Sequence, residues 1–274
     1  MLNEKLKKNK IIEIAKNLLK VRLKDTINKL LLILFGRKWK IIFINEYPKC
    51  GGTWLRYMLE EALLSKGYNT NKKEIKIIKE KHILQRHWLR YTKYAYRTIV
   101  IIRDPRDVYN SFYFHENYHN PNQKYKTIFG YDERKIDKEN MYSYINSKLL
   151  YPELTTPGFS YKVFWDTFKV KKDILFIRYE DLKRDTVREL KKVFEYIGVD
   201  VDEDKINEAI KKYDFENMKK KQENADGRKN HVRKGVVGDW QNNFDENTID
   251  LFKKYYNDTI IDMKYEDGEA WGKK

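Results

Sequence analysis

The sequence predicts a single α/β domain built on a central parallel sheet that is flanked by helices. Three observations support this fold class. Short apolar runs alternate with segments of helical periodicity, which is typical of strands joined by crossover helices. The chain has 274 residues, enough for one sizeable domain but cramped for two. Hydrophobic residues make up 41% of the chain, which is ample for a core.

The first residues of the chain form a separate basic segment. Lysines alternate with apolar residues such as Ile11 and Ile14 at helical spacing, and this pattern ends near Gly36. We predict an amphipathic helical arm over residues 1–38 and the main domain over residues 39–274. The pattern favours a helix packed on the main domain, and the alternative is a helix that contacts a membrane surface or a partner.

A buried strand, a loop and a helix follow the arm. Residues Ile41 to Ile44 form a continuous apolar run, and helical periodicity resumes from Trp54 to Ala62. The loop between them reads YPKCGGTW. Its two glycines free backbone N–H groups to point at an anion, and the helix start adds a partial positive charge. We therefore expect a P-loop-like phosphate site, although the lysine spacing of nucleoside triphosphatases is missing.

Three further strands are predicted along the chain, at Ile83 to Arg86, Thr98 to Ile102 and Ile174 to Ile177. A helix follows the third strand from Pro105, because proline suits the first helical position. Another helix follows the fourth strand and stops at Gly198. Ligands of such sheets bind at the carboxyl ends of the strands, so the turns after Asn45 and Arg103 are the predicted site.

Charge and cysteine content limit the partners and the compartment. The 57 basic and 41 acidic residues give a net charge of +16, so the surface attracts anions of several kinds. The single cysteine, Cys50, excludes an intrachain disulfide framework and a cysteine-rich zinc site, which fits a cytoplasmic protein. The most apolar run, Leu30 to Phe35, is far below the roughly 20 residues of a membrane span. We expect no signal peptide.

Two further loops carry cations that suit an anionic ligand. The first, RDPRDVYNS, runs from Arg103 to Ser111, and an arginine at a strand end offers a planar fork for phosphate oxygens. The second, RKGVVGDW, ends at Trp240, and its two adjacent cations before Gly235 could close over an anion. Taken singly, an ion-pair network or solvated surface charge would also explain each loop.

Together, the three loops resemble those of the sulfotransferases that use 3′-phosphoadenosine 5′-phosphosulfate (PAPS). YPKCGGTW is similar to the family's YPKSGTTW, RDPRDVYNS to its R-(N/D)-P-(K/R)-D-V-x-x-S, and RKGVVGDW to its RKGxxGDW, in the family's order. The resemblance covers about residues 40–245. It implies a single α/β domain that transfers a sulfuryl group from PAPS, without a metal, to a hydroxyl or amine of a small-molecule or carbohydrate acceptor. It implies no nucleic acid partner.

The resemblance also implies which residues hold PAPS. At the 5′ end these are Lys49, Cys50, Gly51, Gly52, Thr53 and Trp54. At the 3′-phosphate they are Arg103, Ser111, Arg233, Lys234 and Gly235. Tyr179 in RYEDL, and Phe215 and Met218 in YDFENM, are similar to family residues near the adenine.

Catalysis is assigned to a lysine and a histidine. Lys49 would stabilise the leaving group, and His87 would take the proton of the acceptor. His87 ends the second predicted strand at its carboxyl end, whereas the runner-up, His82, lies at the far end. The family's Lys-Thr-His triplet corresponds here to Gln85, Arg86 and His87, so the charge of the lysine is lost unless Arg86 replaces it.

Two positions of the first loop depart from the family pattern. Cys50 stands in place of serine and Gly52 in place of threonine, so each removes a hydroxyl from the cradle. Because Cys50 precedes a helix start, we expect a lowered thiol pKa.

Two alternatives from other classes stay open on the sequence. A P-loop-type kinase or triphosphatase would bind ATP with magnesium in the first loop. A nucleic-acid-binding protein is suggested by the charge and by 21 tyrosines among the lysines. The sequence leaves the oligomeric state open.

Overall fold

A computed structural model gives the fold. It describes residues 23, 25–66, 82–119, 138–154, 157–214, 216–220 and 235–272. Four strands form one sheet in the order β2-β1-β3-β4: β1 (Ile42–Glu46), β2 (Ile83–Arg86), β3 (Arg97–Ile102) and β4 (Leu175–Arg178). All neighbouring strands run parallel. The predicted fold class is confirmed, and every strand end lies within two residues of its predicted place.

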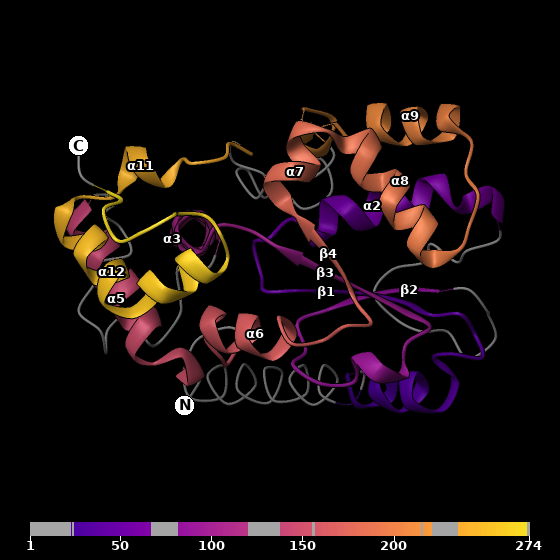
Figure 1. The fold of residues 1–274 in the computed structure, drawn as a ribbon, viewed down its shortest axis with the longest axis horizontal. Coiled ribbons are helices and arrows are strands. Elements are labelled where there is room, and N and C mark those ends of the chain that lie inside the picture. Colours follow the sequence, from indigo (N-terminus) through magenta and orange to yellow (C-terminus); the bar gives the residue numbers. More distant parts are fainter. Residues whose placement is uncertain are drawn as a thin grey trace, which may run out of the picture.

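Helices cover both faces of the sheet and the edge at its carboxyl end (Figure 1). On one face lie α2 (Gly52–Ala62), α7 (Tyr179–Arg184), α8 (Thr186–Ile197) and α9 (Glu203–Lys212). On the other lie α6 (Tyr161–Phe168) and a helix at residues 25–35. Beside the strand ends lie α3 (Pro105–His119), α5 (Lys138–Leu150), α11 (Trp240–Asn243) and α12 (Glu246–Asp262). Short 3₁₀ helices occur at Leu64–Lys66, Thr92–Tyr94 and Pro152–Leu154.

Local sequence signals fix several helix ends. The side chain of Asp185 caps α8 by accepting the N–H of Arg188 at 3.1 Å. The same helix ends at Gly198, whose φ of 69° lies in the left-handed region that glycine adopts freely. Helix α3 begins at Pro105, as predicted.

Alternation along β1 divides its side chains between two apolar clusters. Ile42 and Ile44 belong to the main core, whereas Phe43 packs with Leu31 and Leu32 of the helix at residues 25–35. Leu32 is fully buried there. The arm therefore packs on the main domain where it is described. No described helix is long and apolar enough to cross a membrane.

Candidate active site

The loop between β1 and α2 makes a tight left-handed turn. The φ angle is 77° at Lys49 and 97° at Gly51. A side chain at Gly51 would also lie 2.7 Å from the ring of Tyr179. The N–H groups of Trp54 and Leu55 both donate to the carbonyl of Gly51, at 3.0 and 3.2 Å, so α2 starts directly after the turn. The predicted loop thus presents a helix start at the carboxyl end of the sheet.

A carboxylate is bound at this helix start. Glu46 accepts the N–H of Gly52 at 2.6 Å and the side-chain amide of Gln85 at 2.5 Å. Gln85 also donates to the hydroxyl of Thr53 at 3.1 Å. The turn therefore holds an anionic oxygen on a backbone donor. Glu46 is not among the residues predicted from the sequence, where its only signal is an acidic residue directly before the YPK motif.

Arg103 joins the three predicted loops. Its guanidinium donates to the carbonyl of Lys49 at 3.3 Å and to that of Val236 at 3.1 Å, and it stacks 4.3 Å from the ring centre of Tyr179. The hydroxyl of Tyr179 in turn donates to the carbonyl of Gly235 at 3.3 Å. The loop after β1, the end of β3 and the described part of the RKGVVGDW loop, residues 235–240 (the GDW loop), therefore meet as the sequence predicts.

Asp107 fixes the GDW loop to α3 and was not among the predicted residues. Its carboxylate accepts the N–H groups of Gly238 and Trp240, at 2.7 and 3.0 Å, and lies 3.6 Å from Arg103. Burial raises the pKa of Asp107. Burial by itself would lower the pKa of Arg103, but its neighbours Tyr179, Asp107, Glu180 and Cys50 together raise that pKa, so the guanidinium stays charged.

Cys50 points into the core. Its sulfur is fully buried and lies 4.0 Å from the hydroxyl of Tyr161, which also exchanges hydrogen bonds with the backbone of Arg103. Burial raises the pKa of the Cys50 thiol well above its usual value. The expectation of a lowered pKa is wrong, because desolvation of the thiolate outweighs the helix start.

The two histidines lie at opposite ends of β2. Asn45 pairs with Arg86, so the next residue, His87, reaches the carboxyl end of the sheet. His87 Nδ1 lies 3.0 Å from the carbonyl oxygen of Glu46. A carbonyl can only accept, so in the neutral form of the ring Nδ1 carries the proton and Nε2 has the lone pair.

His82 begins the same strand at its far end. It is 1% exposed, and neither ring nitrogen has a hydrogen-bond partner among the described residues. Burial lowers its pKa to about 4.

Arg86 does not replace the missing lysine of the triplet. It donates to the carbonyl of Gln85, and its Nε lies 4.0 Å from Asp25 in the helix at residues 25–35. The cation beside the Gln85 side chain is Arg56 of α2 instead, which donates to the amide oxygen at 2.8 Å.

The remaining predicted residues are placed unequally. Trp54 lies edge-on to Tyr179, with ring centres 6.2 Å apart. Ser111 is half-buried on α3, and Met218 is 4% exposed. Arg233, Lys234 and Phe215 lie outside the described residues.

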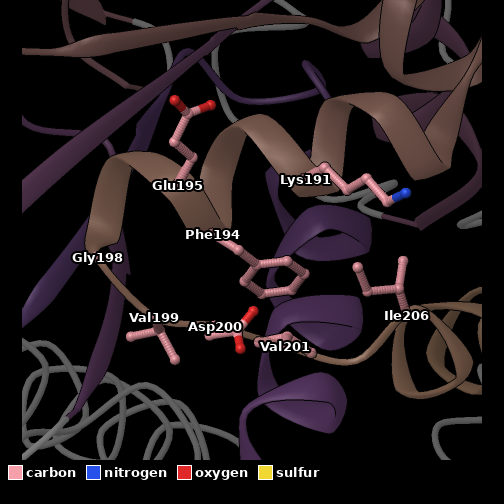
Figure 2. A pocket seen from close by; sticks show the side chains of 8 residues that line it. All are labelled: Lys191, Phe194, Glu195, Gly198, Val199, Asp200, Val201 and Ile206. Carbon is pink, nitrogen blue, oxygen red and sulfur yellow. The ribbon is translucent and has the colours of Figure 1, made fainter.

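A groove of about 500 Å³ lies apart from these loops, where α8 leads into α9 (Figure 2). Its lining comprises Lys191, Phe194, Glu195, Gly198, Val199, Asp200, Val201 and Ile206. None of these is a predicted site residue. No cluster of histidine, cysteine or acidic side chains suited to a metal occurs in the part of the chain that the structure describes.

Comparison with known proteins identifies the family. The profile described as the sulfotransferase domain matches residues 92–264. The chain belongs to the sulfotransferase family. Sulfotransferase 1C2 of Rattus norvegicus is 24% identical to it over 269 residues, which cover 81% of this chain and 83% of the relative. Sulfotransferase 2A1 of Macaca fascicularis is 26% identical over 179 residues, so the match covers 62% of this chain and 58% of that relative.

Solved structures share the sulfotransferase fold. Mouse sulfotransferase SULT7A1 complexed with PAP superposes with a TM-score of 0.64 at 24% identity, covering 86% of this chain and 90% of that chain. Retinol dehydratase in a complex with retinol and PAP gives a TM-score of 0.59 at 16% identity, covering 85% of this chain and 84% of that chain. At these sequence identities the structural likeness shows the fold alone. The family assignment rests on the sequence profile.

Proposed function

We propose that the chain transfers a sulfuryl group from PAPS to a hydroxyl or amine of a small-molecule or carbohydrate acceptor. The observation that carries this proposal is the meeting at Arg103 of the three loops that the sequence predicts to bind an anion. The solved relatives add support, because mouse SULT7A1 and retinol dehydratase were each crystallised with PAP, the desulfated form of PAPS. PAPS would supply the activated sulfuryl group.

Arg103 is suited to the 3′-phosphate. Its side chain is buried and charged, and its Nε–H has no hydrogen-bond acceptor among the described residues. A phosphate oxygen would satisfy that donor. The other residues proposed at this end are Ser111, Arg233, Lys234 and Gly235, with Tyr179, Phe215 and Met218 near the adenine.

The 5′ end would lie on residues 49–54 at the turn before α2, where Lys49 offers a charge and Thr53 a hydroxyl. The N–H groups of Gly52 and Trp54 already donate, to Glu46 and to the carbonyl of Gly51 respectively. In the transfer, the acceptor oxygen or nitrogen bonds to sulfur while the bond from sulfur to the phosphate oxygen breaks. Lys49 would stabilise the negative charge that grows on this phosphate oxygen.

His87 is proposed as the base. The carbonyl of Glu46 holds the proton on Nδ1, so Nε2 is free to receive the proton of the acceptor. His87 lies beside the turn before α2, because β1 and β2 are neighbouring parallel strands that end together.

A thermal-shift comparison of three ligands tests the proposal. We expect PAP to raise the melting temperature, and ATP with magnesium or an oligonucleotide to raise it far less. A shift with ATP and magnesium but not with PAP would favour a kinase or triphosphatase. A shift with the oligonucleotide alone would favour a nucleic-acid-binding protein. Transfer of label from ³⁵S-PAPS to a mixed pool of phenols, alcohols, amines and saccharides then tests the reaction itself.

We further propose that the arm contacts anionic membrane surfaces from the cytoplasmic side. A cytoplasmic location suits the chain because its single cysteine, Cys50, is a free thiol. Residues 1–38 contain 11 basic and 3 acidic residues. In the part of this arm that the structure describes, four apolar side chains at helical spacing are exposed to solvent: Leu23, Ile27, Leu30 and Leu34. An apolar stripe on a basic helix suits an anionic lipid surface.

Sedimentation with vesicles tests this contact. We expect binding to vesicles with phosphatidylserine and not to pure phosphatidylcholine, and loss of binding in Leu30→Glu/Leu34→Glu. Val170→Glu is the control, because Val170 is 71% exposed but lies after α6. Equal binding by the arm variant would contradict the proposal.

A further inference from the structure

Position 52 needs a glycine because a neighbouring side chain leaves no room for a Cβ atom, and not because of the backbone conformation. Its φ is not among the positive values, so any residue could adopt its backbone conformation. A Cβ atom at this position would lie only 2.5 Å from the carboxyl carbon of Glu46 and within 2.7 Å of both carboxylate oxygens. The threonine of the family's YPKSGTTW motif therefore cannot fit while Glu46 holds this place. Glu46 and Gly52 form a matched pair.

The Glu46 carboxylate is held in place by a network of hydrogen bonds. Arg56 donates to the amide oxygen of Gln85 at 2.8 Å, which turns the amide nitrogen of Gln85 toward Glu46. Arg56 is itself paired with Glu60 at 2.6 Å. Glu46 is 3% exposed, and its two donors, the Gly52 N–H and the Gln85 amide, are both neutral. This carboxylate is therefore buried and held on both oxygens, as a fixed part of the loop structure.

The carboxylate uses a donor that the proposed cofactor would need. The N–H of Gly52 opens α2, where the helix start attracts anions. A phosphate oxygen and a carboxylate oxygen cannot share this donor without bringing two negative charges within about 4 Å of each other.

We propose that Glu46 is an internal anion of the phosphosulfate loop, which occupies the Gly52 N–H in the cofactor-free enzyme and leaves it when the 5′ end of PAPS enters. This inference rests on the proposed function, because it concerns the same loop. Glu46 then weakens the binding of every nucleotide with a 5′-phosphate. Nucleotides bound through the 3′-phosphate alone are unaffected, because Arg103 and not Gly52 holds that end.

Titration calorimetry with two nucleotides tests the proposal. Glu46→Gln keeps the size of the side chain and an oxygen for the Gly52 N–H but removes the charge. We expect this variant to bind PAP about tenfold more tightly than the wild type, since one like charge has been removed beside the 5′-phosphate. Its affinity for adenosine 3′-phosphate should stay unchanged. Unchanged or weaker PAP binding by a folded Glu46→Gln would overturn the proposal.

Glu61→Gln is the charge-matched control. Glu61 lies on the same helix but pairs with Lys212 at the surface, at 2.6 Å. Its removal should leave the affinities for both nucleotides unchanged, and an equal gain in PAP affinity would reduce the Glu46 effect to net charge and overturn the proposal. A folding defect in Glu46→Gln would weaken both nucleotides, so the difference between them still decides. If the wild type binds neither nucleotide, the proposed function fails instead.

A double-mutant cycle tests the matched pair. Gly52→Thr should lower PAP affinity in the wild type, because the new side chain and Glu46 compete for one space. In a Glu46→Ala background the same substitution should cost much less. An equal loss in the two backgrounds would overturn the pairing.

Discussion

The guanidinium of Arg103 donates a hydrogen bond to the backbone carbonyl of Lys49 at 3.3 Å, which joins the end of β3 to the turn before α2. The two residues are proposed to serve opposite ends of PAPS. Because the contact uses the backbone of Lys49 and not its side chain, the charges of the two side chains can have separate roles. Their substitutions should therefore have different effects.

Arg103→Ala should mainly weaken cofactor binding. One charge-assisted phosphate contact contributes about 1.5–3 kcal/mol, so the Kd for PAP should rise roughly ten- to hundredfold. Calorimetry with PAP measures this change, and a melting curve of the free variant controls for folding. Near-normal PAP binding by a folded Arg103→Ala would refute the assignment of this residue to the 3′-phosphate.

Lys49→Ala should mainly lower turnover. Its charge is proposed to act on the phosphate oxygen that leaves sulfur, and removing one such stabilising group typically lowers kcat by about 10²–10³. Single-turnover transfer from saturating ³⁵S-PAPS measures the effect. A variant with normal turnover but weak PAP binding would move Lys49 from catalysis to ground-state binding.

Cys50 should resist alkylation in the folded protein. Its sulfur is fully buried, and burial raises its pKa well above the usual value, so little thiolate is exposed to a reagent. Mass spectrometry after iodoacetamide treatment should find no label with or without PAP, and full label in denaturant. Labelling of the folded protein that PAP blocks would restore the lowered thiol pKa that the sequence predicts.

The sequence predicted the parts of this site that depend on the backbone. The two glycines, the apolar run of β1 and Pro105 are local signals, and each specified a turn, a strand or a helix start within the structure. The shared position of the loops after β1 and β3 followed from parallel topology, which brings the carboxyl ends of the strands to one edge of the sheet. The meeting of Lys49 and Arg103 was therefore predictable without coordinates.

Side-chain direction was not predictable in the same way. From the sequence, Cys50 and Gly52 each remove a hydroxyl, whereas in the structure Cys50 packs against Tyr161 and Gly52 makes room for Glu46. The sequence offers Arg86 as a substitute for the lysine, whereas the alternation of β2 directs it toward Asp25. Cys50 and Tyr161, like Arg86 and Asp25, are far apart in sequence, and a single sequence carries no signal for such contacts. Glu46 and Gly52 are near neighbours in sequence, but the direction of the Glu46 side chain is set by the fold of the turn.

His82 should make stability depend on pH. Its pKa is about 4 in the folded protein against about 6.5 when unfolded, so the unfolded chain binds more protons between these values. The free energy of unfolding should therefore fall as the pH drops from about 6.5 to about 4, by roughly 1.4 kcal/mol per pH unit at most. Urea titrations across this range measure the slope, which His82→Leu should reduce. The same slope in both proteins would contradict a buried neutral His82.

His87→Ala should abolish turnover and leave PAP binding intact, because Nε2 of His87 is the proposed acceptor of the proton. His87→Gln is the sharper variant, since its amide can still donate to the carbonyl of Glu46 but offers no basic nitrogen. Transfer from ³⁵S-PAPS and calorimetry with PAP give the two readouts. His82→Gln should retain turnover at neutral pH, because His82 lies at the opposite end of β2. Activity in both His87 variants would show that another group takes the proton, and an inactive His82→Gln beside them would exchange the roles of the two histidines.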